Sequence, residues 1–300
     1  MLSEKIFEIL EEIGRRTRSN PRIFGGMQVV FLGDFFQLPP IETVNDPGTE
    51  KFCFQSPLWF RVFPLKNHVQ LTTVFRQNDR DYIDILMQIR KGYLDDDKIE
   101  ILNKYVKRDY DLEKNNGCVP TKLFALRSKV DMINRNMFSK LEGKEYVCDS
   151  IIKTNCTFYL DSQKAIPADV VQRCLQLSTL EKEYEIENLH NSTPCSKVLR
   201  LKKGAAVMCT VNLDMDNHIC NGSQGIITDI IQTETATLPV VKFTNGVVKT
   251  LLPHFRQSEE YPSIAVGQIP LCLAWALTIH KIQGATLKMA EMDVGTQIFE

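Results

Sequence analysis

The sequence lacks the marks of a membrane, disulfide-rich or strongly charged protein. No apolar run approaches the roughly 20 residues that a helix needs to cross a bilayer, and we expect no membrane partner. The nine cysteines include no C-x-x-C pair and no cysteine–histidine cluster. This favours reduced core thiols in an intracellular protein over disulfides or zinc. The net charge of −1 supplies no global attraction for nucleic acid, and it leaves open whether a local basic groove exists.

A P-loop of the form G-x-x-x-x-G-K-[ST] is also absent from the 300 residues. Such a loop binds phosphates through its backbone N–H groups, and its lysine neutralises their charge. The acidic amphipathic segment at residues 1–14 is not a signal peptide. What is present is an ordinary globular composition, 43% hydrophobic and 24% charged, in a chain long enough for about two domains.

Two apolar runs of the sequence each lead into a polar loop that contains glycine. Residues 27–32 precede the loop G-D-F-F-Q-L-P-P at 33–40, and residues 269–276 precede T-I-H-K-I-Q-G at 278–284. In parallel α/β sheets, ligand-binding groups lie in such loops at the carboxyl ends of buried strands. The sequence therefore predicts two binding loops that are far apart in the chain.

The first predicted domain, residues 1–65, holds one helix and one strand. Apolar residues at i, i+3, i+4 and i+7 predict the inward face of a helix, and Ser3 is placed to cap it. That face consists of Ile6, Ile9, Leu10 and Ile13. Residues 27–32 are apolar throughout, which predicts a central strand covered on both sides. Because one helix and one strand are too few for a stable α/β layer, we expect the rest of this domain upstream of Met1.

A strand–helix unit is predicted in the second domain, which begins near Lys66. Before it, residues 82–89 have helical spacing, and Gly92 suits the position after a helix end. Residues 123–126 then predict a strand, and Ser128 predicts the cap of the helix that follows. The inward face of this helix is expected to be Val130, Ile133, Met137 and Leu141. Residues 269–276 are expected to return to the same sheet.

Between these segments the pattern changes to short β-like runs. They lie at residues 205–211, 225–231, 239–243 and 247–252. Asn221-Gly222 and Asn245-Gly246 punctuate them, and Asn-Gly is the strongest short-range hairpin signal. These runs predict a small antiparallel barrel inserted into the α/β domain. Residues 145–196 have weak periodicity, and we expect a connector with a helix near residues 169–177.

The 33–40 loop offers two candidate polar side chains. Asp34 follows an apolar strand as the acid of a Walker B motif does, but the second acid of that motif is replaced by Phe35. Gln37 is followed by the stiff Leu-Pro-Pro segment. A glutamine in such a place orients water or touches a γ-phosphate in several nucleotide hydrolases. The alternative is a turn residue that satisfies loop amides, and residue spacing alone favours it.

Other candidates lie outside this loop. Arg76 suits an arginine finger, because its planar guanidinium matches phosphate oxygens, although a lone arginine is more often in a surface ion pair. Thr278, His280 and Lys281 are predicted to open a helix, where exposed polar groups suit phosphate binding or simply cap the helix. Trp59 and Trp275 are expected to be packing residues rather than base-stacking platforms.

Five segments of the chain resemble the superfamily 1 DNA helicases of the PIF type. The first is Phe24-Gly25-Gly26 together with the 33–40 loop, and the second reads L-T-T-V-F-R-Q-N-D-R-D-Y-I-D-I-L-M-Q-I-R-K-G at 71–92. The others are residues 123–141 with Arg127 and Asn134, residues 199–225 with N-G-S-Q-G, and residues 270–287. They occur in the family's order and cover most of the chain, with residues 145–196 unmatched.

The resemblance implies roles for the candidate residues. Gln37 would sense the γ-phosphate and Arg76 would contact it as the second catalytic residue. The nucleotide site would also include Gly33, Asp34, Gln283 and Gly284. Thr278, His280 and Lys281 would contact single-stranded DNA, and no metal ligand is assigned. One departure is Ile282, where the family usually has serine.

The implied fold is α/β, with RecA-like (P-loop NTPase-like) helicase domains and an inserted, src-homology-3-like β-barrel. The expected divisions are a truncated first domain at 1–65, a second domain with connector at 66–196, the barrel at 197–268 and a return at 269–300. The P-loop and the acid pair are expected upstream of Met1, and the last arginine motif beyond Glu300.

The implied function is part of an ATP-dependent DNA helicase that moves on single-stranded DNA in repair, recombination or genome maintenance. ATP and Mg²⁺ would be held mainly by the missing upstream motifs, so we expect no hydrolysis by this chain alone. Its location would be the nucleus or mitochondrion in a eukaryote. Two alternatives stay open: a degenerate, non-catalytic module that binds DNA or protein, and a gene-model fragment without an independent role.

Overall fold

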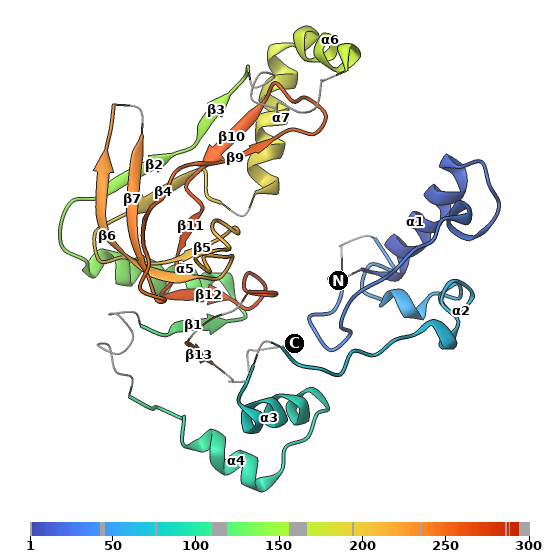
Figure 1. Cartoon of the computed structure of the whole chain (residues 1–300), viewed down its shortest axis with the longest axis horizontal. Coiled ribbons are helices and arrows are strands. Elements are labelled where there is room, and N and C mark those ends of the chain that lie inside the picture. Colours follow the sequence, from blue (N-terminus) through green and yellow to red (C-terminus); the bar gives the residue numbers. More distant parts are fainter. Residues whose placement is uncertain are drawn as a thin grey trace. The chain divides into compact units, whose positions relative to one another are not determined.

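The computed structural model describes residues 2–42, 46–75, 77–109, 119–155, 167–193, 195–234, 236–285, 287 and 289–293. The chain forms two compact units, Met1–Arg108 and Asp109–Glu300. Helices predominate in the first unit, and strands predominate in the second (Figure 1). Within the described ranges, no helix is long and apolar enough to cross a membrane.

The first unit consists of helices joined by extended segments. Its helices are α1 (Glu4–Thr17), α2 (Trp59–Val62), α3 (Arg80–Arg90) and α4 (Asp96–Asn103), and its short 3₁₀ turns are η1 (Ile23–Gly26), η2 (Cys53–Gln55) and η3 (Leu65–Asn67). A small aromatic core is built around Phe7, Phe24 and Trp59, with Phe31 and Phe63 packed against it. The ring centroids of Phe7 and Trp59 lie 5.4 Å apart. Tilted and edge-to-face aromatic packing, rather than a sheet, therefore forms the described core around α1 and α2.

The strand predicted at residues 27–32 is wrong for the described structure, where this segment pairs with no other strand. Val30 and Leu32 are 73% and 90% exposed, while Val29 and Phe31 pack against the aromatic core. A strand covered on both faces requires neighbouring strands. The described part of this unit contains none, so the segment lies as an extended edge with one face inward.

The first helix is confirmed, but the prediction of its buried face is wrong. The hydroxyl oxygen of Ser3 accepts a hydrogen bond from the Ile6 N–H at 3.4 Å, as the cap prediction requires. Ile6, Ile9, Leu10 and Ile13 are all exposed. The residues that α1 buries are instead Phe7, Glu11 and Gly14. The apolar periodicity correctly predicted the helix. Which face of the helix is buried depends on the segments that pack against it.

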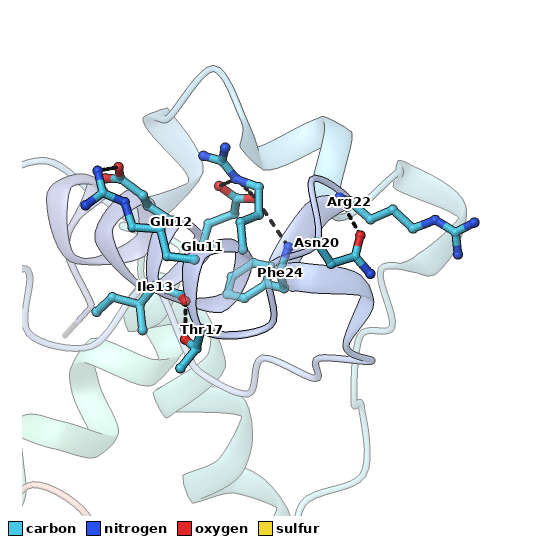
Figure 2. A network of polar contacts seen from close by, with 9 residues as sticks. Glu11, Glu12, Ile13, Thr17, Asn20, Arg22 and Phe24 are labelled. Carbon is cyan, nitrogen blue, oxygen red and sulfur yellow. Dashed lines mark hydrogen bonds and ion pairs between the residues drawn. The ribbon is translucent and has the colours of Figure 1, made fainter.

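A tight turn at Phe24 is fastened to α1 through Glu11 (Figure 2). The buried Glu11 carboxylate accepts from Nε of Arg15 at 2.9 Å and from the Phe24 N–H at 3.2 Å. Phe24, Gly25 and Gly26 all have positive φ angles, of 49°, 62° and 75°. A Cβ on Gly25 would lie 2.3 Å from the carbonyl oxygen of Gly14. The turn therefore requires glycine at position 25 for both its conformation and its close approach.

The second unit contains the predicted strand–helix unit. Strand β1 (Thr121–Phe124) lies between β12 (Ala276–Thr278) and β13 (Ala290–Met292), and both pairings are parallel. Helix α5 (Arg127–Lys140) follows β1, with Val130 buried. The cap prediction is wrong, because the N-cap is Leu126 and Ser128 lies inside the helix.

The predicted barrel strands are confirmed. A five-stranded antiparallel sheet has the order β11 (Leu271–Leu273), β5 (Ala206–Cys209), β6 (Gln224–Gln232), β7 (Thr237–Phe243) and β8 (Val248–Thr250). Asn245-Gly246 makes the β7–β8 hairpin, in which the Phe243 N–H donates to the Val247 carbonyl at 2.8 Å. Inward side chains of these strands, among them Val207, Val241 and Leu271, contribute to the largest core cluster of the described residues.

The single strand expected at residues 269–276 is two strands in two sheets. Strand β11 pairs with the barrel strand β5, whereas β12 pairs with β1. Between them the Ala274 N–H still donates to the Ala206 carbonyl at 2.9 Å, and the Trp275 carbonyl already accepts from the Lys122 N–H at 2.9 Å. One continuous apolar run therefore crosses from the barrel to the parallel sheet.

The segment expected to be a connector contains more structure than its sequence indicated. Strand β2 (Tyr146–Asp149) pairs with β4 (Val198–Leu201), and β3 (Ile151–Lys153) pairs with β10 (Ala265–Gln268), which also pairs with β9 (His254–Gln257). Helix α6 (Ala168–Gln176) confirms the predicted helix. Helix α7 (Thr179–Ser192) was not predicted, although its capping box is readable as Ser178 and Glu181.

Candidate functional site

The 33–40 loop is organised around the carboxylate of Asp34. Oδ1 of Asp34 accepts from the Phe36 N–H at 3.0 Å, and Oδ2 accepts from Nε2 of Gln37 at 3.4 Å. The Asp34 carbonyl accepts from the Gln37 N–H at 3.1 Å. These bonds close a turn in which the exposed side chain of Gln37 is held next to the aspartate.

A distant arginine joins this turn. Arg90, in the last turn of α3, forms an ion pair with Oδ2 of Asp34, and its guanidinium carbon lies 4.6 Å from the centre of the Phe36 ring. The hydrogen bond from Arg90 is the main cause that lowers the pKa of Asp34, and the Phe36 N–H and Gln37 amide act in the same direction. Partial burial opposes them without reversing the shift. Asp34 is therefore a stably ionised anchor of the loop.

This arrangement bears on whether Mg²⁺ fits the loop. Both oxygens of Asp34 already accept hydrogen bonds, and one of them pairs with a cation. Because the Arg90 cation already neutralises this carboxylate, the structure gives no support for Asp34 as a magnesium ligand. Elsewhere in the described ranges, no group of three or more His, Cys, Asp or Glu side chains is placed to hold a metal ion.

The first unit contains two other residues that are predicted to contact the nucleotide, Gly33 and Arg76. Gly33 is exposed, and a Cβ built on it would meet nothing within 4 Å, so no contact of the structure requires glycine there. Arg76 lies outside the described residues, and its role stays a prediction.

The second loop begins where β12 ends, at Thr278. The predicted helix start is wrong, because residues 279–284 form successive turns. The Lys281 N–H donates to the Thr278 carbonyl at 3.0 Å and to its Oγ1 at 3.3 Å, and the Gln283 N–H donates to the His280 carbonyl at 3.3 Å. Gly284 has a φ of 81°. A left-handed residue at this point ends the turns instead of allowing a helix to continue.

The side chains of the second loop divide into buried anchors and exposed polar groups. Ile279 and Ile282 pack against a core cluster that includes Met208 and Leu277. His280 and Lys281, like Gln283, are exposed, and Thr278 is half-buried. The isoleucine at 282 is therefore accounted for by packing, and the loop presents its polar side chains outward.

Asn134 of α5 fixes the strand that carries this loop. Its Nδ2 donates to the Ala276 carbonyl at 2.9 Å, and its Oδ1 accepts from the Ala276 N–H at 2.9 Å. On the other side of β12, the Ile279 N–H donates to the Phe124 carbonyl at 3.0 Å. Because β12 lies at the edge of the sheet among the described residues, the Asn134 amide takes the place of a neighbouring strand.

Sequence reasoning missed two of these supports. Arg90 lies within the quoted R-K-G end of a helix, but nothing local in the sequence marks its partner 56 residues earlier. The sequence singles out Asn134 only through the resemblance to the helicase family. A polar residue on the inward side of a helix is also a signal in itself, since buried amides require partners.

The chain is similar to known helicases along its whole length. The family model described as PIF1-like helicase matches residues 1–100, and the model of the DNA helicase Pif1 2B domain matches residues 186–230. The ATP-dependent DNA helicase PIF1 of Xenopus laevis is 30% identical over 306 residues, which include 100% of this chain and 42% of the relative. The chain thus spans less than half the length of this curated relative.

Solved structures give the same result. The crystal structure of Pif1 helicase from Candida albicans is 30% identical with a TM-score of 0.65, covering 100% of this chain and 66% of that one. The crystal structure of Bacteroides Pif1 bound to single-stranded DNA is 25% identical with a TM-score of 0.54, covering 99% and 63%. RecA-like helicase domains with an inserted barrel are therefore the architecture that this chain shares.

Proposed function

The chain belongs to the PIF1-like helicase family, and we propose that it is part of an ATP-dependent DNA helicase that moves on single-stranded DNA and unwinds duplexes. Similarity along the whole chain to helicases of this name carries the proposal. The biological setting that fits is DNA repair, recombination or genome maintenance. Movement would come from RecA-like domains that close on ATP and open after hydrolysis.

In this proposal the 33–40 loop serves the nucleotide. The exposed amide of Gln37 is suited to contact the γ-phosphate or its attacking water, and Arg76 would supply positive charge to the same phosphate. ATP needs in addition a phosphate cradle, which the 300 residues do not contain in P-loop form. Mg²⁺ would accompany ATP and be held by residues other than Asp34.

The 278–284 loop would serve the DNA. Thr278, His280 and Lys281 lie at the carboxyl end of a parallel strand, in a loop anchored from below by apolar side chains. Hydroxyl, imidazole and ammonium groups contact phosphates without regard to base sequence. A relative with bound single-stranded DNA has the same overall fold, which supports this placement.

DNA contact can be tested with the 300-residue chain. We expect weak binding to a labelled oligonucleotide by fluorescence anisotropy, with a log-log salt slope of about −0.7 per phosphate neutralised. The His280→Ala, Lys281→Ala double variant should bind more weakly. Lys140→Ala, which removes an exposed lysine from α5, is the matched control and should bind normally. Equal affinity of the double variant and the native chain would show that this loop does not contact DNA. Oligonucleotide binding that does not depend on salt would favour a protein partner instead.

The nucleotide assignment is tested in a protein that joins this chain to a P-loop. There, Arg76→Ala should slow ATP hydrolysis by a factor on the order of 10³, as loss of an arginine finger does. Gln37→Ala should slow hydrolysis while nucleotide binding persists. Either variant with native turnover would contradict the role of that residue.

The chain alone is expected not to hydrolyse ATP. Phosphate release by residues 1–300 in the presence of DNA should stay far below the roughly 1–100 per second of ordinary enzymes. DNA binding without hydrolysis in every natural form of the protein would favour the non-catalytic binding module instead.

A further inference from the structure

We propose that Arg90 is a positioning residue that holds the 33–40 loop, and Gln37 within it, in the geometry needed to meet the γ-phosphate. The proposal rests on the proposed function, because it assigns Arg90 a part in the reaction assigned to Gln37. It adds a residue that belongs to neither predicted binding loop.

The contacts run in series from Arg90 to Gln37. The Arg90 guanidinium pairs with Oδ2 of Asp34, and that same oxygen accepts from Nε2 of Gln37 at 3.4 Å. The guanidinium also lies over the Phe36 ring, 4.6 Å from its centre. Arg90 therefore touches the residue before Gln37 in the chain and the side chain that binds its amide.

The loop is tied to the rest of its unit on two sides. On one side the Phe35 ring centroid lies 4.8 Å from that of Phe54 and 6.1 Å from that of Trp59. On the other side, Asp34 and Phe36 meet Arg90. A Cβ built on Gly33 would meet nothing within 4 Å, and Phe36 is 69% exposed. The hydrogen bonds among Asp34, Phe36 and Gln37 span at most three residues and do not tie the turn to another element. Arg90, 56 residues further along the chain, supplies such a tie.

The helix that carries Arg90 is held at both of its ends. Helix α3 is capped by Asp79, whose carboxylate accepts from the Tyr82 N–H at 3.1 Å, and Ile85 of the helix is 2% exposed. Next to Arg90, the buried Gln88 donates to Asp95 at 2.8 Å and accepts from the Asp95 N–H at 3.0 Å. The carboxyl end of α3 is thereby fastened to the start of α4.

The chemistry of the contact favours arginine over lysine. A guanidinium is planar and delocalised, so one face lies on an aromatic ring while its edge meets a carboxylate. An ammonium group is a compact charge that keeps the ion pair but loses the stacking. Arg90→Lys should thus retain part of the positioning, and Arg90→Ala should retain none.

The first test uses the ATP-hydrolysing protein that contains this chain. Arg90→Ala should lower kcat for ATP by on the order of 10-fold to 100-fold, as misplacement of a reacting group does, with KM for ATP nearly unchanged. Arg90→Lys should recover part of kcat. Arg80→Ala, which removes an exposed arginine from the first turn of the same helix, is the matched control and should keep native kcat.

The second test needs no ATP. In the 300-residue chain, the carboxyl carbon of Asp34 is followed by NMR as the pH is lowered. The native Asp34 should titrate below the ordinary range of aspartate, Arg90→Ala should raise its pKa, and Arg90→Lys should lie between them. Circular dichroism checks that each variant is folded, and the lysine variant keeps the test open if the alanine variant unfolds.

The outcomes separate the two proposals. If the pKa of Asp34 is the same in Arg90→Ala and in the native chain, Arg90 does not pair with Asp34 in solution. The positioning role is then overturned, because it depends on that contact. Native kcat in Arg90→Ala, with hydrolysis abolished in Gln37→Ala, overturns it while the proposed function stands. Native turnover in Gln37→Ala overturns the assignment of Gln37 and the positioning role together.

Discussion

At the scale of single residues, Gly25 makes the sharpest demand on the sequence. Residues with a side chain rarely adopt its φ of 62°, and a Cβ there would lie 2.3 Å from the Gly14 carbonyl oxygen. We expect Gly25→Ala to destabilise the first unit well beyond the roughly 1–2 kcal/mol of a left-handed alanine alone. Urea unfolding followed by Trp59 fluorescence, in a Trp275→Phe background, measures this loss.

Gly92 provides the control for that prediction. It also has a positive φ, of 81°, but a Cβ there would meet nothing within 4 Å. Gly92→Ala should therefore show the conformational cost only, about 1–2 kcal/mol. Equal losses in the two variants would mean that the close approach of the turn to α1 contributes nothing.

The candidate residues of the first loop were predictable only in part. Asp34 and Gln37 stand out because they follow an apolar run and precede two prolines, which is local information. The ion pair with Arg90 joins residues 56 positions apart. No pattern of spacing indicates which of many surface arginines will reach a given carboxylate, so this contact required the structure.

At the scale of elements, Asn134 joins α5 to the edge strand β12. Ala276 is 0% exposed, and its N–H and carbonyl are both bonded by the Asn134 amide. Asn134→Ala should leave both groups without these partners, at about 1–3 kcal/mol for each group. Urea unfolding followed by Trp275, in a Trp59→Phe background, measures the loss. Asn136→Ala, at an exposed position of the same helix, should be nearly neutral, and a similar loss there would contradict the clamp.

The loop between β5 and β6 should make the second unit sensitive to acid. Lys249 of β8 pairs with Asp214, and this hydrogen bond, with help from Asn217, lowers the pKa of Asp214 to about 2. An unfolded aspartate has a pKa of about 3.9. Because the folded pKa is the lower one, the stabilisation is complete above about pH 4 and is lost as the pH falls to about 2.

Asp214→Asn tests this pH dependence. The urea midpoint of the native chain should exceed that of the variant near neutral pH, and the gap should close between about pH 4 and about pH 2. Asp216→Asn, which changes an exposed residue of the same loop, is the control. A gap that stays constant with pH would show that the loss comes from the asparagine side chain and not from the charge.

Elements were predictable where their signals are local. The strands β6, β7 and β8 were found because alternation and Asn-Gly turns lie within the segments themselves. The prediction of a strand at residues 27–32 is wrong because a strand requires a neighbouring strand to pair with. The described part of the unit contains no such neighbour. The prediction of a single strand at residues 269–276 is wrong because this one apolar run contributes to two sheets. Hydrophobicity alone does not indicate which sheet a strand joins.

At the scale of the whole molecule, the two units differ in how much core they contain. The described residues give the first unit a cluster of four buried hydrophobic residues, whereas the largest cluster of the second has fifteen. The apolar face of α1 stays exposed in the first unit. Composition alone, at 43% hydrophobic for the entire chain, does not reveal this imbalance.

The imbalance predicts two unfolding transitions. The chain has two tryptophans, and each is buried in one unit, Trp59 in the first and Trp275 in the second. Trp275→Phe and Trp59→Phe variants therefore report on one unit each in urea. We expect the first unit to lose its structure at lower urea, because it buries less apolar surface against the entropy of ordering its chain. Transitions that coincide for both probes would mean that the units unfold as one cooperative structure, contrary to their separate cores.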